Sequence, residues 1–103
     1  MSGSGAEAPS GGWIPPDPAV QPFFDPEGHL IIVPAKRAKR LLVLDRLAQL
    51  FEPGEHYPET EVNRRLRVAH EDVAMLRRYL VDEGFLDRAA GVYWRIGGSV
   101  DGV

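Results

Sequence analysis

The pattern of apolar and polar positions predicts a first helix over Lys36–Phe51, which ends before Pro53-Gly54. At about 100° per residue, one face of this helix is apolar along its length: Leu41, Leu44, Leu47, Ala48 and Phe51. Val43 and Leu50 fall outside that face. A helix with so broad an apolar surface needs cover on a second side. We expect that cover to come either from the segment that precedes the helix or from another subunit.

Two shorter helices are predicted next, joined by a tight turn. Glu59–Val68 has apolar residues at helical spacing and acids in its first turn, where the helix dipole favours negative charge. The second helix, Glu71–Glu83, is terminated by Gly84, and its outward face carries Arg78 with Met75 beside it. Two short helices joined in this way, the second of them amphipathic, are typical of a helix-turn-helix.

Strand patterns lie on both sides of the three helices. His29–Val33 is rich in β-branched residues and ends at Pro34, so it predicts a short strand. After Gly84, two strand-like stretches flank Ala89-Ala90-Gly91, which predicts a β-hairpin. The order of helix, helix, helix and hairpin predicts an α+β fold, a small winged helix-turn-helix domain over residues 29–96.

The two ends of the chain differ from this domain. Residues 1–28 hold most of the prolines, so we predict a disordered or loosely docked Pro/Gly-rich arm. Two apolar pairs in this arm, Trp13-Ile14 and Phe23-Phe24, favour folding back onto the domain over docking on a partner. Residues 97–103 are rich in glycine and predict a flexible tail.

Composition narrows the class of protein. The 103 residues include no cysteine, which excludes disulfides, thiolate metal sites and cysteine nucleophiles and suits a reducing cytoplasm. No apolar run approaches the roughly 20 residues of a transmembrane helix, and the first residues lack the pattern of a signal peptide. We therefore expect a cytoplasmic protein with no membrane partner.

Charge alone does not decide whether the chain binds nucleic acid. The formal net charge is −3, which argues weakly against such binding. All 12 Lys and Arg lie between Lys36 and Arg95, however, where ten acids leave a balance of +2 (12 − 10).

The stretch from about Pro34 to Arg95 resembles a bacterial family named domain of unknown function 2087. The resemblance rests on PAKRAKRLLVLDRLAQLF, FEPGEHYPETEVNRRL, HEDVAMLRRYLVDEGFLDR and the closing YWR. The family has no assigned function, and its members occur alone or appended to helix-turn-helix regulators, which implies a transcription-linked role by association only. The chain departs from the family at Pro58, where Thr or Ser usually opens a capping box; the loss corresponds to about 1 kcal/mol of capping.

No catalytic or ligand-binding motif is visible in the sequence. The three histidines fall in different predicted elements, and no HExxH, phosphate-binding glycine loop or carboxylate cluster of metal-ligand spacing occurs. The serines lie in the two ends of the chain, where a nucleophile is not held in place. We therefore predict a protein that is not an enzyme, with no metal, no cofactor and no small-molecule ligand.

Two functions remain open, of which nucleic-acid binding, with DNA as the partner, leads. In a winged helix, the second helix of the pair enters the major groove, so Met75 and Arg78 would face base edges while other bases contact phosphate. The candidate residues are Lys36, Arg37, Lys39, Arg40, Arg64, Arg67, Met75, Arg78, Arg88 and Arg95. The presumed recognition helix nevertheless carries two bases against four acids, Glu71, Asp72, Asp82 and Glu83, which opposes binding to phosphates.

The alternative is a protein-interaction or homodimerisation module that does not contact nucleic acid. The broad apolar surface of the first helix and the aromatic residues of the last strand support it. Its candidate contact residues are Val43, Leu50, Tyr93 and Trp94.

Overall fold

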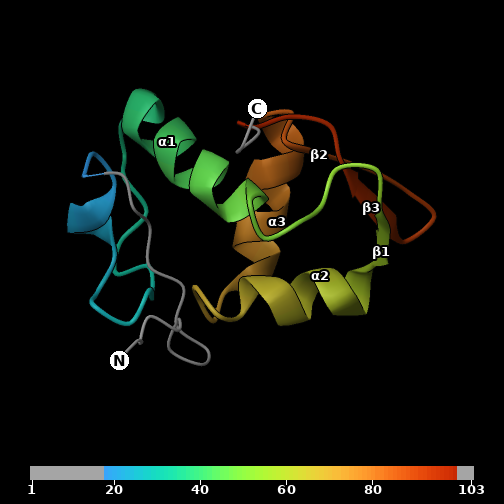
Figure 1. Ribbon diagram of the computed structural model, residues 1–103, viewed down its shortest axis with the longest axis horizontal. Coiled ribbons are helices and arrows are strands. Elements are labelled where there is room, and N and C mark those ends of the chain that lie inside the picture. The colour runs from blue at the N-terminus through green and yellow to red at the C-terminus, as the bar shows by residue number, and fades with distance from the viewer. Residues whose placement is uncertain (1–17, 100–103) are drawn as a thin grey trace, which may run out of the picture.

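The computed structural model describes residues 18–99 (Figure 1). Three helices, α1 (Arg37–Ala48), α2 (Glu59–Leu66) and α3 (Val73–Asp82), combine with three strands, β1 (His56–Pro58), β2 (Leu86–Ala89) and β3 (Val92–Arg95). The strands form one antiparallel sheet in the order β1-β3-β2. In Figure 1 the sheet lies at one end of the helices and residues 18–34 lie at the other. The fold is α+β, as the sequence predicts.

α1 is shorter than predicted, and its second apolar side is covered from within the chain. After Ala48 the backbone tightens into bonds three residues apart, such as Phe51 N to Ala48 O at 3.1 Å. Val43 is only 1% exposed, and residues of the preceding segment join the same buried cluster: Val20, Phe24 and Leu30. The segment before the helix thus contributes to the core. Trp13 and Ile14 lie outside the described residues.

The predicted strand over His29–Val33 does not form. It is reduced to one isolated bridge between Phe24 and Leu30, and residues 31–34 take no regular structure. β-Branched residues favour an extended chain, but a strand also needs a neighbouring strand, and only a few residues of the arm lie alongside. Ile31 and Ile32 consequently remain 63% and 58% exposed.

The hairpin is confirmed, and a third strand joins it. β2 and β3 pair with Leu86 opposite Arg95 and Ala89 opposite Val92. The turn consists of Ala90 (φ 52°) and Gly91 (φ 79°), both in the left-handed region that a two-residue type I′ turn requires. β1 was not predicted, because three residues ending in a proline carry no alternating pattern. It pairs with β3 through Tyr57 opposite Tyr93.

The two shorter helices differ in how their N-termini are capped. α2 follows Pro58, which provides no side-chain cap, as expected from the missing capping box. α3 begins two residues later than predicted because Asp72 acts as its N-cap: a carboxylate oxygen of Asp72 accepts a hydrogen bond from the backbone N–H of Met75 at 3.1 Å.

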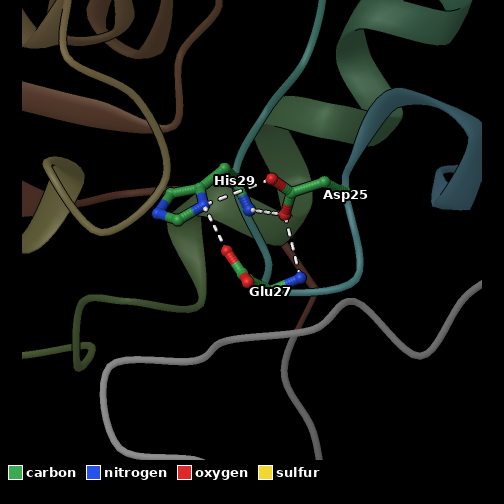
Figure 2. A group of neighbouring side chains, drawn as sticks. All are labelled: Asp25, Glu27 and His29. Atoms are coloured by element: carbon green, nitrogen blue, oxygen red, sulfur yellow. Dashed lines mark hydrogen bonds and ion pairs between the residues drawn. The ribbon is translucent and has the colours of Figure 1, made fainter.

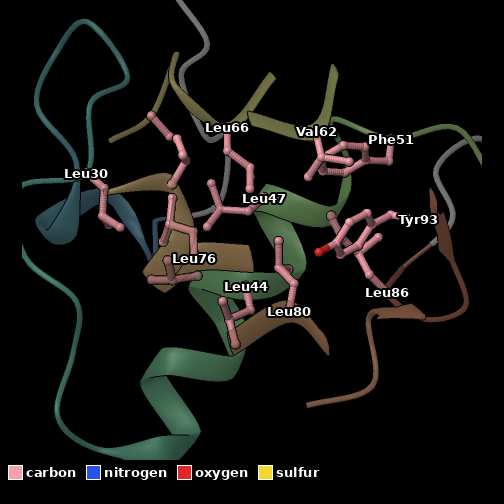
Figure 3. Packing of buried hydrophobic residues seen from close by; sticks show 14 of the residues in the cluster. Leu30, Leu44, Leu47, Phe51, Val62, Leu66, Leu76, Leu80, Leu86 and Tyr93 are labelled. Atoms are coloured by element: carbon pink, nitrogen blue, oxygen red, sulfur yellow. The ribbon is translucent and has the colours of Figure 1, made fainter. Parts of the chain in front are cut away.

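A single hydrophobic cluster joins all of these elements (Figure 3). Its largest fully buried side chains are Tyr93, Phe51, Leu44, Leu47, Leu66, Leu76, Leu80, Leu86, Val20, Val43 and Val62. Within the described part of the chain, no helix has the length and apolar character needed to cross a membrane.

The first residues of the predicted flexible tail are held against α1. The backbone N–H and the hydroxyl of Ser99 donate to the two carboxylate oxygens of Asp45, at 2.6 and 2.8 Å. The side-chain amide of Gln49 donates to Ser99 O at 2.7 Å. The expectation of flexibility is therefore wrong for residues 97–99, because a carboxylate on α1 satisfies both donors of Ser99. Residues 100–103 lie outside the described part.

Candidate nucleic-acid interface

The exposed surface of α3 is a narrow stripe. Val73, Leu76 and Leu80 are buried, whereas Ala74, Arg78 and Asp82 are exposed. The three exposed residues are spaced four apart, so they lie one above another on the side of the helix that faces away from the core. Arg78 is at the centre of this stripe, as the sequence predicts.

Two shallow depressions border the stripe, one on each side. The first, of about 390 Å³, is lined by Asp72, Ala74, Met75, Arg78 and Tyr79. The second, of about 210 Å³, is lined by Ala74, Arg77, Arg78, Val81, Asp82 and Arg88. Because Ala74 and Arg78 line both, they form the ridge between the two depressions. Arg88 belongs to β2 and lines the second depression. It lies opposite Tyr93 in the pairing of β2 with β3, so the two side chains share the inner face of the sheet.

One basic residue near the start of α1, Arg40, contacts a side chain that lines the first depression. The guanidinium of Arg40 lies 5.1 Å from the centre of the Tyr79 ring, and one of its nitrogens donates to Ala35 O at 2.9 Å. Arg37 forms an ion pair with Glu83, with 2.7 Å between its Nη2 and the carboxylate. Lys36 and Lys39 are exposed and form no ion pair within residues 18–99. Contacts from Arg37 and Arg40 thus attach the start of α1 to α3.

Two of the four acids that oppose phosphate binding are already engaged. Glu83 accepts hydrogen bonds from Arg37, which lower the pKa of its carboxyl below the usual value, and Asp72 caps α3. The same ion pair raises the pKa of Arg37. Glu71 and Asp82 are exposed and have no ion-pair partner in the described part of the chain. The ion pair thus offsets the charge of Glu83 but occupies Arg37, while Asp72 keeps its negative charge.

The bases of α2 are divided between internal contacts and solvent. Arg64 and Arg65 both bind Glu61, at 2.5 and 2.8 Å, and their hydrogen bonds lower the pKa of that carboxyl to about 2. Arg65 also donates to Leu50 O at 2.7 Å and lies over the Tyr57 ring. Arg67, at the end of α2, is exposed and unpaired among the residues described.

Arg95 holds the fold together, which corrects its predicted role as a phosphate contact. Its guanidinium donates to Phe51 O at 3.1 Å, to Gly97 O at 2.8 Å and to Ser99 O. These carbonyls come from the end of the α1 segment and from the tail. With its donors directed at the backbone, the side chain is not available to a phosphate.

The predicted protein-interaction surface is also corrected. Val43 and Tyr93 are 1% and 2% exposed, so neither lies on a surface in this fold. Leu50 is partly buried against the core. Trp94 is partly exposed on the outer face of the sheet, where its ring lies 5.2 Å from that of His56. The two buried residues were misplaced because helical spacing and strand alternation do not reveal which residues a distant segment covers.

Three contributors to the interface were missed in the sequence. Ala74 could have been identified from the sequence, because it lies four residues before Arg78 and therefore on the same face of the helix. Tyr79 and Arg77 depend on tertiary contacts: Tyr79 on Arg40, and Arg77 on Asn63, whose side-chain oxygen accepts from it at 2.5 Å.

A cluster of three potential metal ligands lies in the segment before α1 (Figure 2). Ligand atoms of Asp25, Glu27 and His29 all lie within 4.8 Å of one another, which corrects the expectation that no such cluster occurs. One oxygen of Asp25 accepts from the backbone N–H of His29 and of Glu27, both at 2.9 Å, which lowers the pKa of Asp25. His29 Nδ1 is 3.3 Å from the other oxygen. Contacts within the turn account for this grouping.

Comparison with known proteins identifies one family. A family model described as an uncharacterised protein conserved in bacteria (DUF2087) matches residues 29–95. No curated protein and no solved structure matches the chain. The assignment to the winged-helix class therefore stays a prediction.

Proposed function

The chain belongs to the bacterial family DUF2087, and from that starting point we propose that it is a non-enzymatic DNA-binding protein of the winged-helix type, cytoplasmic and linked to transcription. The observation that carries the proposal is the guanidinium of Arg78, which is exposed on the ridge of α3 and has no ion pair among residues 18–99. In helix-turn-helix proteins the second helix of the pair lies in the major groove.

The distribution of bases around α3 supports the proposal. Arg88 adjoins one side of the ridge, while Lys36 and Lys39 belong to the helix end that Arg40 attaches to the other side. A major groove is bordered by two phosphate backbones, so a reading helix benefits from cations on both sides. The arrangement therefore suits a duplex whose groove receives α3.

The test is the titration of the protein into a fluorescent duplex of about 30 base pairs and random sequence, followed by anisotropy. Four phosphate contacts, from Lys36, Lys39, Arg67 and Arg88, imply a slope of about −3.6 in log Kobs against log salt. Binding should therefore weaken by roughly 100-fold between 50 and 200 mM salt. Absence of binding at 50 mM contradicts the proposal.

A matched pair of variants separates this interface from charge in general. Arg78→Ala removes the guanidinium that would face the groove and should weaken binding. Arg64→Ala removes the same charge, but from a side chain already bound to Glu61, and Arg65 continues to neutralise that carboxylate. We expect Arg64→Ala to change binding less than Arg78→Ala. Equal losses in the two variants would place the contact elsewhere.

A second candidate function is that of a protein-interaction module, and exposed apolar side chains favour it. Ile31 and Ile32 lie in an extended segment that has no neighbouring strand beyond the bridge at Leu30. This candidate predicts a dimer in sedimentation velocity that dissociates in Ile32→Glu and persists in Ile96→Glu, another exposed isoleucine. A protein that is monomeric at all concentrations contradicts it.

A further inference from the structure

The reading surface of α3 contains few groups that distinguish one base pair from another. Its exposed positions are Ala74, Arg78 and Asp82. Alanine offers a methyl group alone, and Asp82, at the last position of the helix, carries a carboxylate that DNA phosphates repel. Asp72, at the start, is engaged as the N-cap. Arg78 is thus the one exposed residue of α3 placed to donate hydrogen bonds to a base edge.

The side chains that line the depressions on either side of the ridge add little base recognition. Met75 and Tyr79 line the first depression, but the Tyr79 ring is covered by Arg40. Arg77 lines the second depression, but its guanidinium is engaged by Asn63, with Glu59 3.7 Å away. Direct reading of a site by a helix normally uses three or four side chains that reach base edges. This helix provides one.

The unpaired bases, by contrast, lie mostly outside the reading surface. Lys36 and Lys39 belong to the start of α1, Arg67 to the end of α2 and Arg88 to β2. All four are exposed and lack an ion pair within the described residues, but Arg88 is also hydrogen-bonded to the side chain of Tyr93, which raises the pKa of its guanidinium. Side chains around a recognition helix contact phosphates, which are the same in every sequence.

We infer that this protein binds duplex DNA chiefly through its phosphates and tolerates most sequences, with a preference limited to the base pair that Arg78 contacts. The inference rests on the proposed function and names the kind of DNA bound. A bidentate arginine favours guanine by roughly ten- to a hundred-fold at one position. Because a guanine occurs in almost any mixed duplex and phosphates do not vary, affinities for unrelated duplexes should differ by less than about tenfold.

The experiment is selection from a randomised duplex library with the full chain, followed by anisotropy on unrelated duplexes at one salt concentration. We expect enrichment of no more than one or two defined base pairs and a narrow range of affinities. Enrichment of a motif of four or more base pairs overturns the inference and leaves the proposed function intact. Absence of binding to every duplex at low salt overturns the proposed function, and the inference with it.

Two variants of equal charge show which residue sets the preference. Arg78→Ala should weaken binding and abolish the preference for guanine, whereas Arg67→Ala should weaken all duplexes by one common factor and retain that preference. Circular dichroism verifies that each variant is folded, and Arg78→Lys, which keeps the charge without the bidentate geometry, provides a second route. A guanine preference that survives in both Arg78 variants overturns the inference.

Discussion

Replacement of Arg95 by alanine distinguishes the structural role of this residue from the DNA contact that the sequence suggests. The guanidinium donates to three backbone carbonyls, of which Phe51 O belongs to a residue that is only 1% exposed. Loss of a partner for a buried carbonyl destabilises a protein by about 1–3 kcal/mol, while water replaces the partners of exposed carbonyls. We therefore expect a loss of about 2 kcal/mol.

Such a loss is readily measured in a domain of this size. Each kcal/mol lowers Tm by roughly 4–8 °C in a domain of 60–100 residues, so Arg95→Ala should lower Tm by about 8–16 °C in thermal unfolding followed by circular dichroism. Arg67→Ala is the matched control, since it removes the same charge from an exposed side chain that has no ion pair among the described residues; its effect should stay within about 0.5 kcal/mol. Equal stability of the two variants, with DNA binding lost in Arg95→Ala, would refute this reasoning.

Three further predictions concern the turn, a helix cap and an ion pair. Ala90→Asn should stabilise the protein by about 0.5–1 kcal/mol in urea unfolding, because Ala90 has a φ of 52° and asparagine tolerates this conformation better. Asp72→Ala should destabilise it by about 1 kcal/mol, since the first turn of α3 loses its cap. Stability should fall as pH is lowered from about 4.5 toward 2, because Glu61 ionises with a pKa of about 2 in the folded state against 4.5 ordinarily. A carboxyl whose pKa is depressed by folding stabilises the protein above its unfolded pKa, and protonation removes that contribution.

Each of these predictions has its own control. Ala89→Asn, in the strand before the turn, should give no gain, and an equal gain in both variants would exclude the turn as the cause. Asp72→Asn retains a capping oxygen, so it should recover most of the stability lost in Asp72→Ala. Glu61→Gln should reduce the fall in stability between pH 4.5 and 2, and an unchanged pH profile would show that Glu61 is not responsible.

The three helices and the hairpin were predictable because their information is local. Leu44, Leu47 and Phe51 recur at helical spacing, and the turn before Val92 contains a glycine, so each element follows from a short stretch of chain. The predicted helix ends were less accurate. α3 begins after Asp72 because the carboxylate of Asp72 accepts a hydrogen bond from a backbone N–H, and residue spacing does not specify this geometry.

The roles of the charged residues were mostly not predictable. Arg64 and Arg95 read alike as phosphate contacts, but one binds Glu61 and the other binds backbone carbonyls. Arg78 was placed correctly, since the outward face of an amphipathic helix follows from the helix itself. Glu61 lies three residues before Arg64 on one helix, so that pair was within reach of the sequence. The partners of Arg95, in contrast, depend on which carbonyls the fold brings within reach of its five donors.

The sequence by itself determined the class of fold, the order of the helices and the hairpin, and the exposed position of Arg78 on α3. Only the tertiary structure decided that the segment around Val20 and Phe24 joins the core, that His56–Pro58 completes the sheet, and that Glu83 is neutralised by Arg37. The physical reason is the range of the interactions. Periodicity and turn chemistry act between residues a few positions apart, whereas strand pairing, burial and an ion pair such as Arg37–Glu83 join residues that are distant along the chain.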